Sequence, residues 1–275
     1  MGKLDGKVAF ITGAARGQGR SHALRLAQEG ADIIAVDLCA QLESVPYPMS
    51  TPEDLAETVS QVEALDRRIV SAVGDVRDPA AMRAIVAEGI AQLGGVDIVL
   101  ANAGILGISM LPDVDQDALF REVIDINLTG VWNTVSAAAP AMIEQGRGGA
   151  IVLTSSTQGL TGRGGDGSGA FTGYCASKHA VVGMMRSFAH WLAPHNIRVN
   201  TVHPTGVNTT MIVNENMQEV VEAMGANVEA ALGNLMPIDM VETIDISNAI
   251  AWLVSDEARY VTGVTLPVDA GFTVK

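Results

Sequence analysis

The sequence is poor in cysteine, in aromatic residues and in positive charge. Its two cysteines, Cys39 and Cys175, lie far apart without a CxxC arrangement, which argues against a disulfide framework or a zinc site and favours a reducing, cytoplasmic location. Only 17 Lys and Arg face 31 Asp and Glu, and the formal charge of -14 opposes binding to nucleic acid or to anionic lipid. Aromatics make up 4% and hydrophobic residues 48%, so the core must be aliphatic.

Long apolar runs and metal-binding spacings are missing as well. No stretch approaches a membrane span, and the start of the chain, MGKLDGKVAFITG, lacks the apolar region and cleavage site of a secretory signal. The histidines do not stand at ligand spacing with carboxylates or cysteines, so we predict no metal site and interpret them as helix or loop residues. They are His22, His179, His190, His195 and His203.

What the sequence does contain is an alternation of short apolar runs and longer segments with helical spacing. The predicted strands are 8–12, 33–37, 69–73, 96–101, 150–154, 198–203 and 265–268. The predicted helices are 19–29, 52–66, 79–93, 115–145, 171–193 and 243–255. This alternation predicts one α/β domain over residues 1–275, a Rossmann-type doubly wound parallel sheet of about seven strands with helices on both faces. Ligands are expected at the carboxyl ends of the strands.

Three segments interrupt the alternation. Residues 39–51 contain two prolines and little periodicity, so they form a longer loop than a strand-helix join needs. Residues 161–172 are a glycine-rich insert. Residues 208–237 are rich in Met and Asn, and we expect them to form a lid over a pocket.

A glycine loop, TGAARGQGR, follows the first predicted strand and opens a helix. Gly13, Gly17 and Gly19 permit a tight turn and close backbone approach, while the helix N-terminus offers free N–H groups to a pyrophosphate. Arg16 and Gln18 belong to the same predicted site. The alternative is a turn that merely needs glycine, and the strand-helix context favours nucleotide binding.

Asp37 ends the second predicted strand, about twenty residues after the loop, where a carboxylate binds the adenosine ribose hydroxyls. It would repel a 2′-phosphate, and Leu38 supplies no compensating cation, so NAD is favoured over NADP. Arg16 is the counterargument, because it either pairs with such a phosphate or is a solvated loop residue. Asp37 could also be an ordinary turn former.

Tyr174 and Lys178 stand four residues apart, on one face of a predicted helix. An ammonium roughly 4 Å from a phenol contributes about 4 kcal/mol at an effective dielectric near 20, so we expect Lys178 to lower the pKa of Tyr174 from ~10 by about three units, before desolvation reduces the effect. Ser156, in preference to Ser155, is the predicted hydroxyl that orients the substrate oxygen. Alternatively, Tyr174 and Lys178 are a solvated pair on the helix without a catalytic role, and Ser156 is a strand-end cap.

Together these motifs resemble the short-chain dehydrogenases/reductases over nearly the whole chain. The resemblance rests on TGxxxGxG at Thr12 to Gly19, on the strand end Ala101 to Gly104 and on YxxxK at Tyr174 and Lys178. It implies that the main-chain carbonyl of Asn127 holds a water in a proton relay, and that Lys178 also holds the nicotinamide ribose. It further implies a homotetramer formed through long helices.

The resemblance also assigns the remaining cofactor contacts. It places Pro204 at a turn, the Val207 backbone at the nicotinamide carboxamide and the Thr209 hydroxyl beside it, although Thr205 replaces the family's glycine in HPTGVNT. The other cofactor residues implied are Asp75, Val76, Asn102, Ala103 and Gly104.

Within that family the sequence is most similar to the mycofactocin-associated, carveol dehydrogenase-like members. The similarity lies in ARGQGR, the 39–51 insert, the glycine-rich insert and HPTGVNT. It implies a bound NAD that stays through turnover and is reoxidised in place by an external carrier of mycofactocin type, with residues 39–51 covering the adenosine end.

We therefore predict an NAD-dependent enzyme that interconverts a secondary alcohol and a ketone, with Tyr174 as the general base and acid. A lipophilic, terpenoid alcohol is suggested by the resemblance and by the Met-rich segment. Two alternatives stay open: an NADPH-dependent biosynthetic ketoreductase, and a nucleotide-sensing protein without catalysis.

Overall fold

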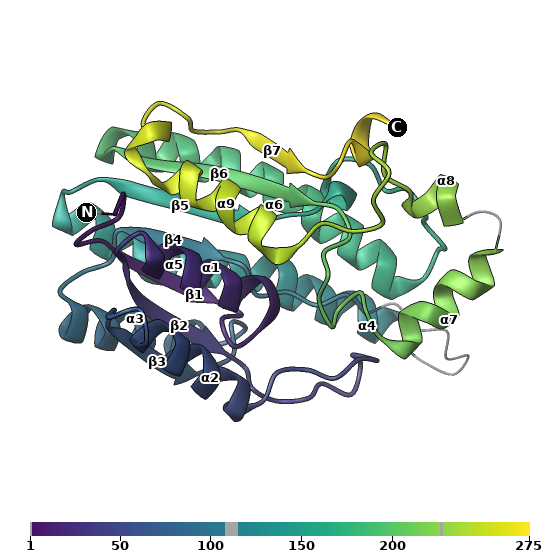
Figure 1. Ribbon diagram of the computed structural model, residues 1–275, viewed down its shortest axis with the longest axis horizontal. Helices are drawn as coiled ribbons and strands as arrows, with labels where there is room; N and C mark the ends of the chain where they lie inside the picture. The colour runs from purple at the N-terminus through teal and green to yellow at the C-terminus, as the bar shows by residue number, and fades with distance from the viewer. Residues whose placement is uncertain (1, 108–114, 226–227) are drawn as a thin grey trace.

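A computed structural model describes residues 2–107, 115–225 and 228–275, and these form one parallel sheet in the order β3-β2-β1-β4-β5-β6-β7 (Figure 1). The strands are β1 (Val8–Thr12), β2 (Asp32–Asp37), β3 (Ile69–Val73), β4 (Ile98–Ala101), β5 (Gly149–Thr154), β6 (Ile197–Pro204) and β7 (Thr265–Val268). The doubly wound prediction is confirmed. β1 pairs with β2 on one side and with β4 on the other. The order in which successive strands are added to the sheet therefore reverses at β1.

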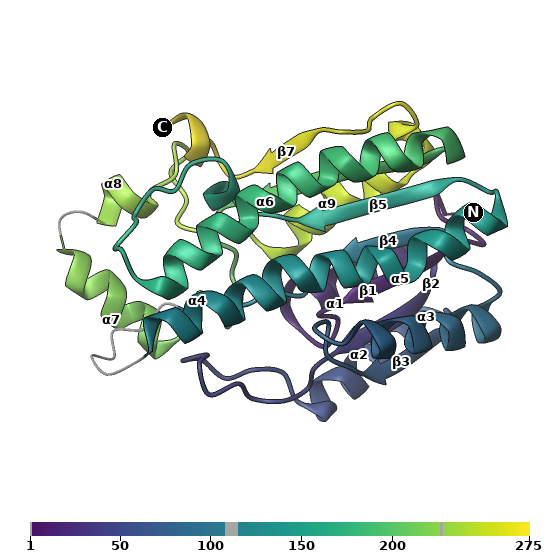
Figure 2. The ribbon, with the colours of Figure 1, turned by 180° about the vertical axis from the view of Figure 1, so that it is seen from behind.

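Helices cover both faces of the sheet (Figures 1 and 2). One face carries α1 (Gly17–Gln28), α2 (Pro52–Glu63) and α9 (Thr243–Val254), and the other carries α3 (Pro79–Leu93), α5 (Gly130–Gln145) and α6 (Gly169–Leu192). The remaining helices are α4 (Gln116–Ile124), α7 (Glu215–Met224) and α8 (Val228–Leu232). In the described ranges no helix combines the length and hydrophobicity that a bilayer span requires.

The helix boundaries follow from capping residues in the sequence. Thr51 caps α2 through a reciprocal pair of hydrogen bonds with Asp54, and a proline occupies the first helical position. Asp78 caps α3, and that helix ends at Gly94, which adopts a left-handed conformation. These local signals explain why the sequence pattern located both helices correctly.

Alternate side chains of the strands fill two aliphatic cores, one on each face of the sheet. Phe10 and Ile34 belong to one core, and Ala9 and Ile11 belong to the other. All five residues of β1 are buried, as expected for a central parallel strand. The rigid sheet fixes where the loops at its carboxyl edge begin.

Two predicted segments differ in detail. The predicted helix 115–145 is formed by α4, a π-helical turn at Asp125–Thr129, and α5, so the hydrogen-bond register shifts at Asn127. The Met-rich segment 208–237 contains α7 and α8, while 226–227 lie outside the described residues.

Candidate active site

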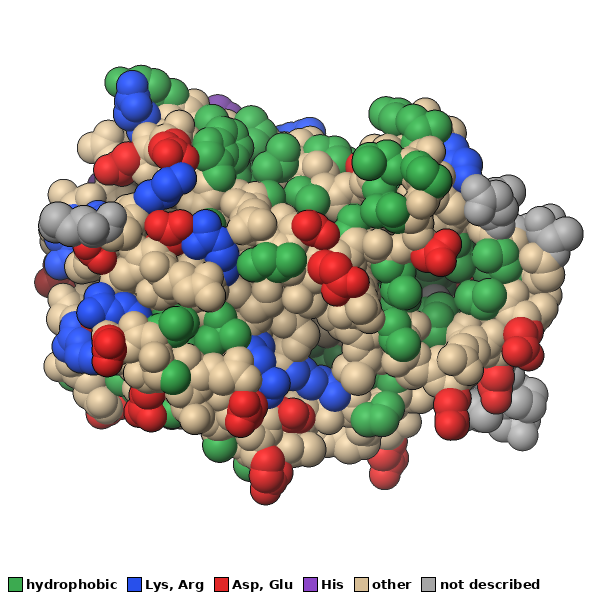
Figure 3. Space-filling model, in the orientation of Figure 1, with side chains coloured by type: hydrophobic (Ala, Val, Ile, Leu, Met, Phe, Trp, Pro, Cys, Tyr) green, Lys and Arg blue, Asp and Glu red, His purple; other side chains and the backbone are tan. Residues whose placement is uncertain are grey.

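A pocket opens at the carboxyl ends of β1, β2 and β4, where the strand order reverses. Most of the predicted cofactor residues line it, namely Gly13, Arg16, Gly17, Gln18, Gly19, Asp37, Leu38, Asp75, Val76, Asn102, Ala103, Gly104 and Thr209. The lining also includes Leu42, Tyr47, Met49 and Ser50 from the predicted cover 39–51, Met211 from the predicted lid 208–237, and Ile105, which the sequence did not indicate. The hollow on the right of the molecule is bordered by hydrophobic side chains (Figure 3).

The glycine loop has the geometry of a cradle. Gly13 has φ +68°, and a Cβ there would lie 3.0 Å from the Cα of Ala103. A Cβ on Gly19 would lie 1.9 Å from the carbonyl oxygen of Gly13, so the start of α1 packs directly on the turn. The Oε1 atom of Gln18 is buried without a hydrogen-bond partner. A backbone cradle at a helix N-terminus with an unpartnered polar atom beside it fits a dinucleotide pyrophosphate.

Thr12 and Asn102 join the ends of β1 and β4 beneath this cradle. The Thr12 hydroxyl accepts the N–H groups of Asn102 and Ala103, each at 3.1 Å. The Asn102 amide donates to the Thr12 carbonyl, also at 3.1 Å. The floor of the pocket is thus held by hydrogen bonds between two adjacent strands.

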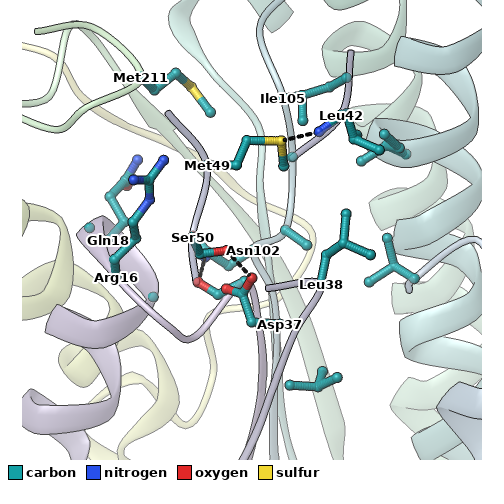
Figure 4. A pocket seen from close by; sticks show the side chains of 18 of the residues that line it. Arg16, Gln18, Asp37, Leu38, Leu42, Met49, Ser50, Asn102, Ile105 and Met211 are labelled. Atoms are coloured by element: carbon teal, nitrogen blue, oxygen red, sulfur yellow. Dashed lines mark hydrogen bonds between the residues drawn. The ribbon is translucent and has the colours of Figure 1, made fainter. Parts of the chain in front are cut away.

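Asp37 has protein donors on both carboxylate oxygens. One oxygen accepts the Ala15 N–H at 2.9 Å, and the other accepts the Cys39 N–H at 3.2 Å and the Ser50 hydroxyl at 2.5 Å (Figure 4). These contacts orient the carboxylate at the pocket wall. The sequence predicted this placement but not the part played by Ser50.

Residues 39–51, which we call the strap, fold back across the pocket. The Gln41 side chain bonds the carbonyls of Leu42, Val45 and Tyr47, and it also accepts the Met49 N–H. The strap therefore has a defined internal structure. Its two prolines and lack of periodicity predicted a loop, and the family resemblance predicted that this loop covers the adenosine end.

Arg16 joins the glycine loop to this strap. Its guanidinium donates to the carbonyl oxygen of Pro48. We had considered Arg16 as a solvated residue or as a phosphate partner, and the contact with Pro48 is a further role that the sequence did not indicate. Only the folded strap brings a carbonyl from 32 residues away to the loop.

Asp75 and Val76 follow β3 and enter the same pocket. Burial works to raise the pKa of Asp75, but hydrogen bonds from the Arg77 side chain and N–H outweigh it and hold that pKa below its usual value. The Val76 carbonyl accepts the amide of Asn133 on α5 at 2.8 Å. Both residues are thereby fixed at the pocket edge.

Tyr174 lies on α6 with the Ser156 side chain beside its hydroxyl. Burial raises the pKa of Tyr174, and the Ser156 bond opposes that rise. The expected net lowering by Lys178 is therefore wrong. The physical reason is that Lys178 is buried and Tyr174 is partly buried, while the Lys178 ammonium donates to the Thr154 carbonyl at 2.8 Å and lies 5.6 Å from the centre of the Tyr174 ring.

The two neighbouring serines have different partners. The Ser155 hydroxyl donates to the Lys178 carbonyl at 2.8 Å, inside the protein. The Ser156 hydroxyl accepts the Gln158 N–H at 3.1 Å while it also contacts Tyr174. Ser156 thus caps a short turn beside the phenol, so its role as a cap does not exclude the site role that we predict.

His203 supports Ser156 from behind, which the sequence did not indicate. Its Nδ1 lies 2.8 Å from the Ser156 carbonyl oxygen, and its Nε2 lies 2.8 Å from the Thr201 hydroxyl. Burial lowers the pKa of His203 to about 4. A neutral, buried imidazole therefore holds the strand end that carries Ser156.

Asn127 lies in the π-helical turn and clamps the loop after β4. Its side chain accepts the Ile105 N–H and donates to the Ile105 carbonyl, both at 2.8 Å. A Cβ on Gly104 would lie 3.2 Å from the Asn127 oxygen and 3.5 Å from the Lys178 ammonium nitrogen. Gly104, which lines the pocket, therefore brings the pocket next to Asn127 and Lys178.

The segment after β6 reaches the pocket only through its later residues. Pro204 ends β6, Val207 forms a bridge with Val241, and Thr209 lines the pocket. The Thr205 hydroxyl donates to Asn234 at 2.8 Å. The residue that replaces the expected glycine thus ties this turn to the segment before α9.

Within the described part of the chain, no group of three or more His, Cys, Asp or Glu side chains is arranged to hold a metal ion. His22 is fully buried, with Nδ1 2.8 Å from the Ser247 hydroxyl and Nε2 without a partner. Our interpretation of the histidines as satisfied residues therefore holds for only one of the two ring nitrogens of His22.

Comparison with known proteins adds independent evidence. Residues 7–220 match the family model described as short chain dehydrogenase. The chain is 56% identical over 272 residues to an uncharacterized oxidoreductase of Mycobacterium tuberculosis, covering 99% of this chain and 98% of that protein. It is 46% identical to (-)-trans-carveol dehydrogenase of Rhodococcus erythropolis, covering 100% of both.

Solved structures agree with these sequence matches. A carveol dehydrogenase from Mycobacterium avium in complex with NAD is 51% identical and superposes with a TM-score of 0.92, covering 100% of both chains. A short chain dehydrogenase from Mycobacterium paratuberculosis bound to NAD is 49% identical, with the same TM-score and coverage.

Proposed function

Because the chain belongs to the short-chain dehydrogenase/reductase family, we propose that it is an NAD-dependent oxidoreductase that interconverts a secondary alcohol and a ketone. The observation that carries this proposal is the position of the Lys178 ammonium nitrogen, which lies 5.6 Å from the centre of the Tyr174 ring and adjoins Gly104 in the lining of the pocket. A proton-transfer group beside a dinucleotide site is the equipment that such a reaction needs.

The chain's residues divide the work of the reaction. Tyr174 takes the hydroxyl proton of the alcohol, and Ser156 orients the substrate oxygen and stabilises its developing charge. Lys178 holds the nicotinamide ribose, and Asn127 supports the exit of the proton. When bound, NAD supplies the carbon that accepts the hydride.

The residues proposed to hold NAD occupy successive parts of the pocket. The cradle of Gly13, Gly17 and Gly19 binds the pyrophosphate, and Asp37 with Leu38 binds the adenosine ribose. Asp75 and Val76 flank the adenine. We assign Asn102, Ala103, Gly104 and Thr209 to the nicotinamide side of the pocket, with Pro204 and Val207 in the turn that leads to Thr209.

Asp37 is the basis for NAD rather than NADP. Its carboxylate faces the pocket with fixed orientation, and Arg16 is bonded to the strap. A 2′-phosphate would meet the carboxylate without a free arginine in that position. Relatives in complex with NAD support the same choice.

For the substrate we propose a lipophilic secondary alcohol of terpenoid type. The support is the similarity to proteins named carveol dehydrogenase, together with Met211 at the pocket. Residues 208–237 supply a lid over this end of the site.

The strap suggests that NAD stays bound through turnover. It is pinned at Asp37 by Ser50 and at Arg16 by the Pro48 carbonyl, so it closes the adenosine end from outside. A retained cofactor needs reoxidation in place, and we assign that to an external redox carrier of mycofactocin type.

We also propose a cytoplasmic homotetramer. Trp132 and Trp191 are 50% and 43% exposed; Trp132 stacks on Phe188 at a ring distance of 5.8 Å, and Trp191 is tilted against it at 6.1 Å. These aromatics on α5 and α6 offer an apolar face for another subunit. Cys39 and Cys175 are free thiols, in keeping with a reducing compartment.

One preparation tests the cofactor and the reaction together. The protein is purified without added nucleotide, denatured, and the released small molecules are identified by mass spectrometry; a mole of NAD per mole of chain is expected. The native protein is then supplied with secondary alcohols and an artificial electron acceptor, and ketone formation is measured.

Other outcomes of this preparation would point elsewhere. Tight, selective binding of NADPH would support a biosynthetic ketoreductase instead. Bound nucleotide with no turnover of any alcohol or ketone would support a nucleotide sensor. Light scattering tests the oligomer, where a mass other than four chains would contradict the tetramer.

A further inference from the structure

Tyr47 connects the strap to the loop that follows β4. Its hydroxyl accepts the N–H of Leu106 at 3.2 Å, across 59 positions of sequence. The Tyr47 side chain is buried among the residues of one core, with Val45 and Ile105. A strap that covered only the adenosine end would not need a buried phenol that reaches the loop after β4.

The loop that receives this contact is part of the reaction centre. Asn127 clamps Ile105 through two hydrogen bonds, and Tyr47 fixes the next residue, Leu106. Gly104, immediately before them, adjoins Lys178. Successive backbone groups are therefore held by one side chain from the π-helical turn and one from the strap.

Resting on the dehydrogenase function proposed above, we propose that Tyr47 is a positioning residue of the active site, which sets the Gly104–Leu106 backbone beside Lys178 and so links closure of the strap to turnover. Tyr47 touches no reacting atom and acts through the Leu106 N–H. Because burial raises its pKa to about 12, the phenol stays protonated and neutral over the working pH range. A neutral hydroxyl accepts this bond without placing a second charge near Tyr174.

The strap offers a contrast that separates positioning from covering. Ser50 fastens the strap to Asp37 at the adenosine end, whereas Tyr47 fastens it to the loop after β4. Ser50→Ala loosens the cover and leaves the Leu106 contact in place. Tyr47→Phe keeps the buried ring and removes only the hydroxyl. Tyr260→Phe, at a side chain that is 88% exposed, is the matched control for the chemical change.

The experiment measures turnover and backbone exchange in the full-length protein at saturating NAD. In Tyr47→Phe we expect kcat to fall about three- to tenfold and the peptide containing Leu106 to exchange its amide hydrogens several-fold faster, as loss of one buried hydrogen bond implies. Ser50→Ala should release NAD faster, while the peptide containing Leu106 exchanges its amide hydrogens at the wild-type rate. Tyr260→Phe should match wild type in both.

An unchanged kcat in Tyr47→Phe, or unchanged exchange at Leu106, would overturn the positioning role. Equal kcat losses in Tyr47→Phe and Ser50→Ala would do so too, because a general loosening of the strap would then explain both. If the wild-type protein turns over no alcohol, the dehydrogenase function fails, and the exchange measurement still reports whether Tyr47 holds the loop.

Discussion

The ammonium nitrogen of Lys178 lies 5.6 Å from the centre of the Tyr174 ring while it donates to the carbonyl oxygen of Thr154 at 2.8 Å. The lysine is thus fixed by backbone rather than by a carboxylate. Burial lowers its pKa to about 8, and burial raises that of Tyr174. Charge in this part of the site is costly to the folded protein, and that cost can be measured.

Lys178→Met should abolish turnover yet raise the melting temperature at pH 7 by a few degrees, because it removes a buried charge. The unfolded lysine binds a proton up to pH ~10.5 and the folded one only to about 8, so the wild-type free energy of unfolding gains a rising contribution between those values. Denaturant titrations at pH 7 to 10 would show it. Lys3→Met, at an exposed site, is the control. If the free energy of unfolding of Lys178→Met showed the same dependence on pH as that of wild type, the buried lysine would not be its source.

Tyr174→Phe should lower kcat by about 10² to 10⁴-fold, since it removes the proton-transfer group. The ring remains, so NAD content after purification should equal that of wild type. Steady-state kinetics and mass spectrometry of the released cofactor measure the two effects. Activity close to wild type would refute the assignment of Tyr174 as the general base.

Ser156→Ala should lower kcat by about 10²-fold and move the pH profile of alcohol oxidation toward higher pH. The direction follows from the Ser156 hydrogen bond, which lowers the pKa of Tyr174 and is lost in the variant. Ser155→Ala is the neighbouring control, since its hydroxyl bonds the Lys178 carbonyl inside the protein. A larger loss in Ser155→Ala than in Ser156→Ala would reverse the assignment of the two serines.

Asp37→Asn should weaken NAD binding about tenfold and reduce the preference for NAD over NADP, because the repulsive charge is gone while the side chain keeps its size. Binding of both nucleotides to protein freed of its cofactor would be measured by calorimetry. Asp117→Asn, on an exposed part of α4, should leave both affinities unchanged. Unaltered selectivity in Asp37→Asn would show that other groups choose the cofactor.

Stability should fall as the pH drops below about 6.5. Burial lowers the pKa of His22 to about 3 and that of His203 to about 4, so the unfolded chain binds protons that the folded chain refuses. Each histidine contributes a slope of about 1.4 kcal/mol per pH unit where only the unfolded form is protonated. Denaturant titrations from pH 7 to 4.5 measure this slope. His22→Asn should be less stable at pH 7 but less sensitive to acid, and an equal slope in both proteins would rule out His22 as a source.

The sequence by itself determined the fold and the place of the nucleotide pocket, because those follow from local rules. These rules act over a few neighbouring residues. They are the strand and helix periods, the capping residues Thr51 and Asp78, and the glycines at the turn after β1. Parallel strands then bring their carboxyl ends to one edge, so the cofactor residues at the ends of β1, β2 and β4 had to meet.

Only the tertiary structure decided the contacts that join distant segments and the protonation of buried groups. Nothing local in the strap links Tyr47 to Leu106 or Pro48 to Arg16, because such pairs form only after the loop folds back. The sequence suggested that Lys178 would lower the pKa of Tyr174, but desolvation depends on how deeply both side chains are buried. The spacing of two residues along a helix fixes the directions in which their side chains point, whereas the desolvation of those side chains depends on the packing of the whole molecule.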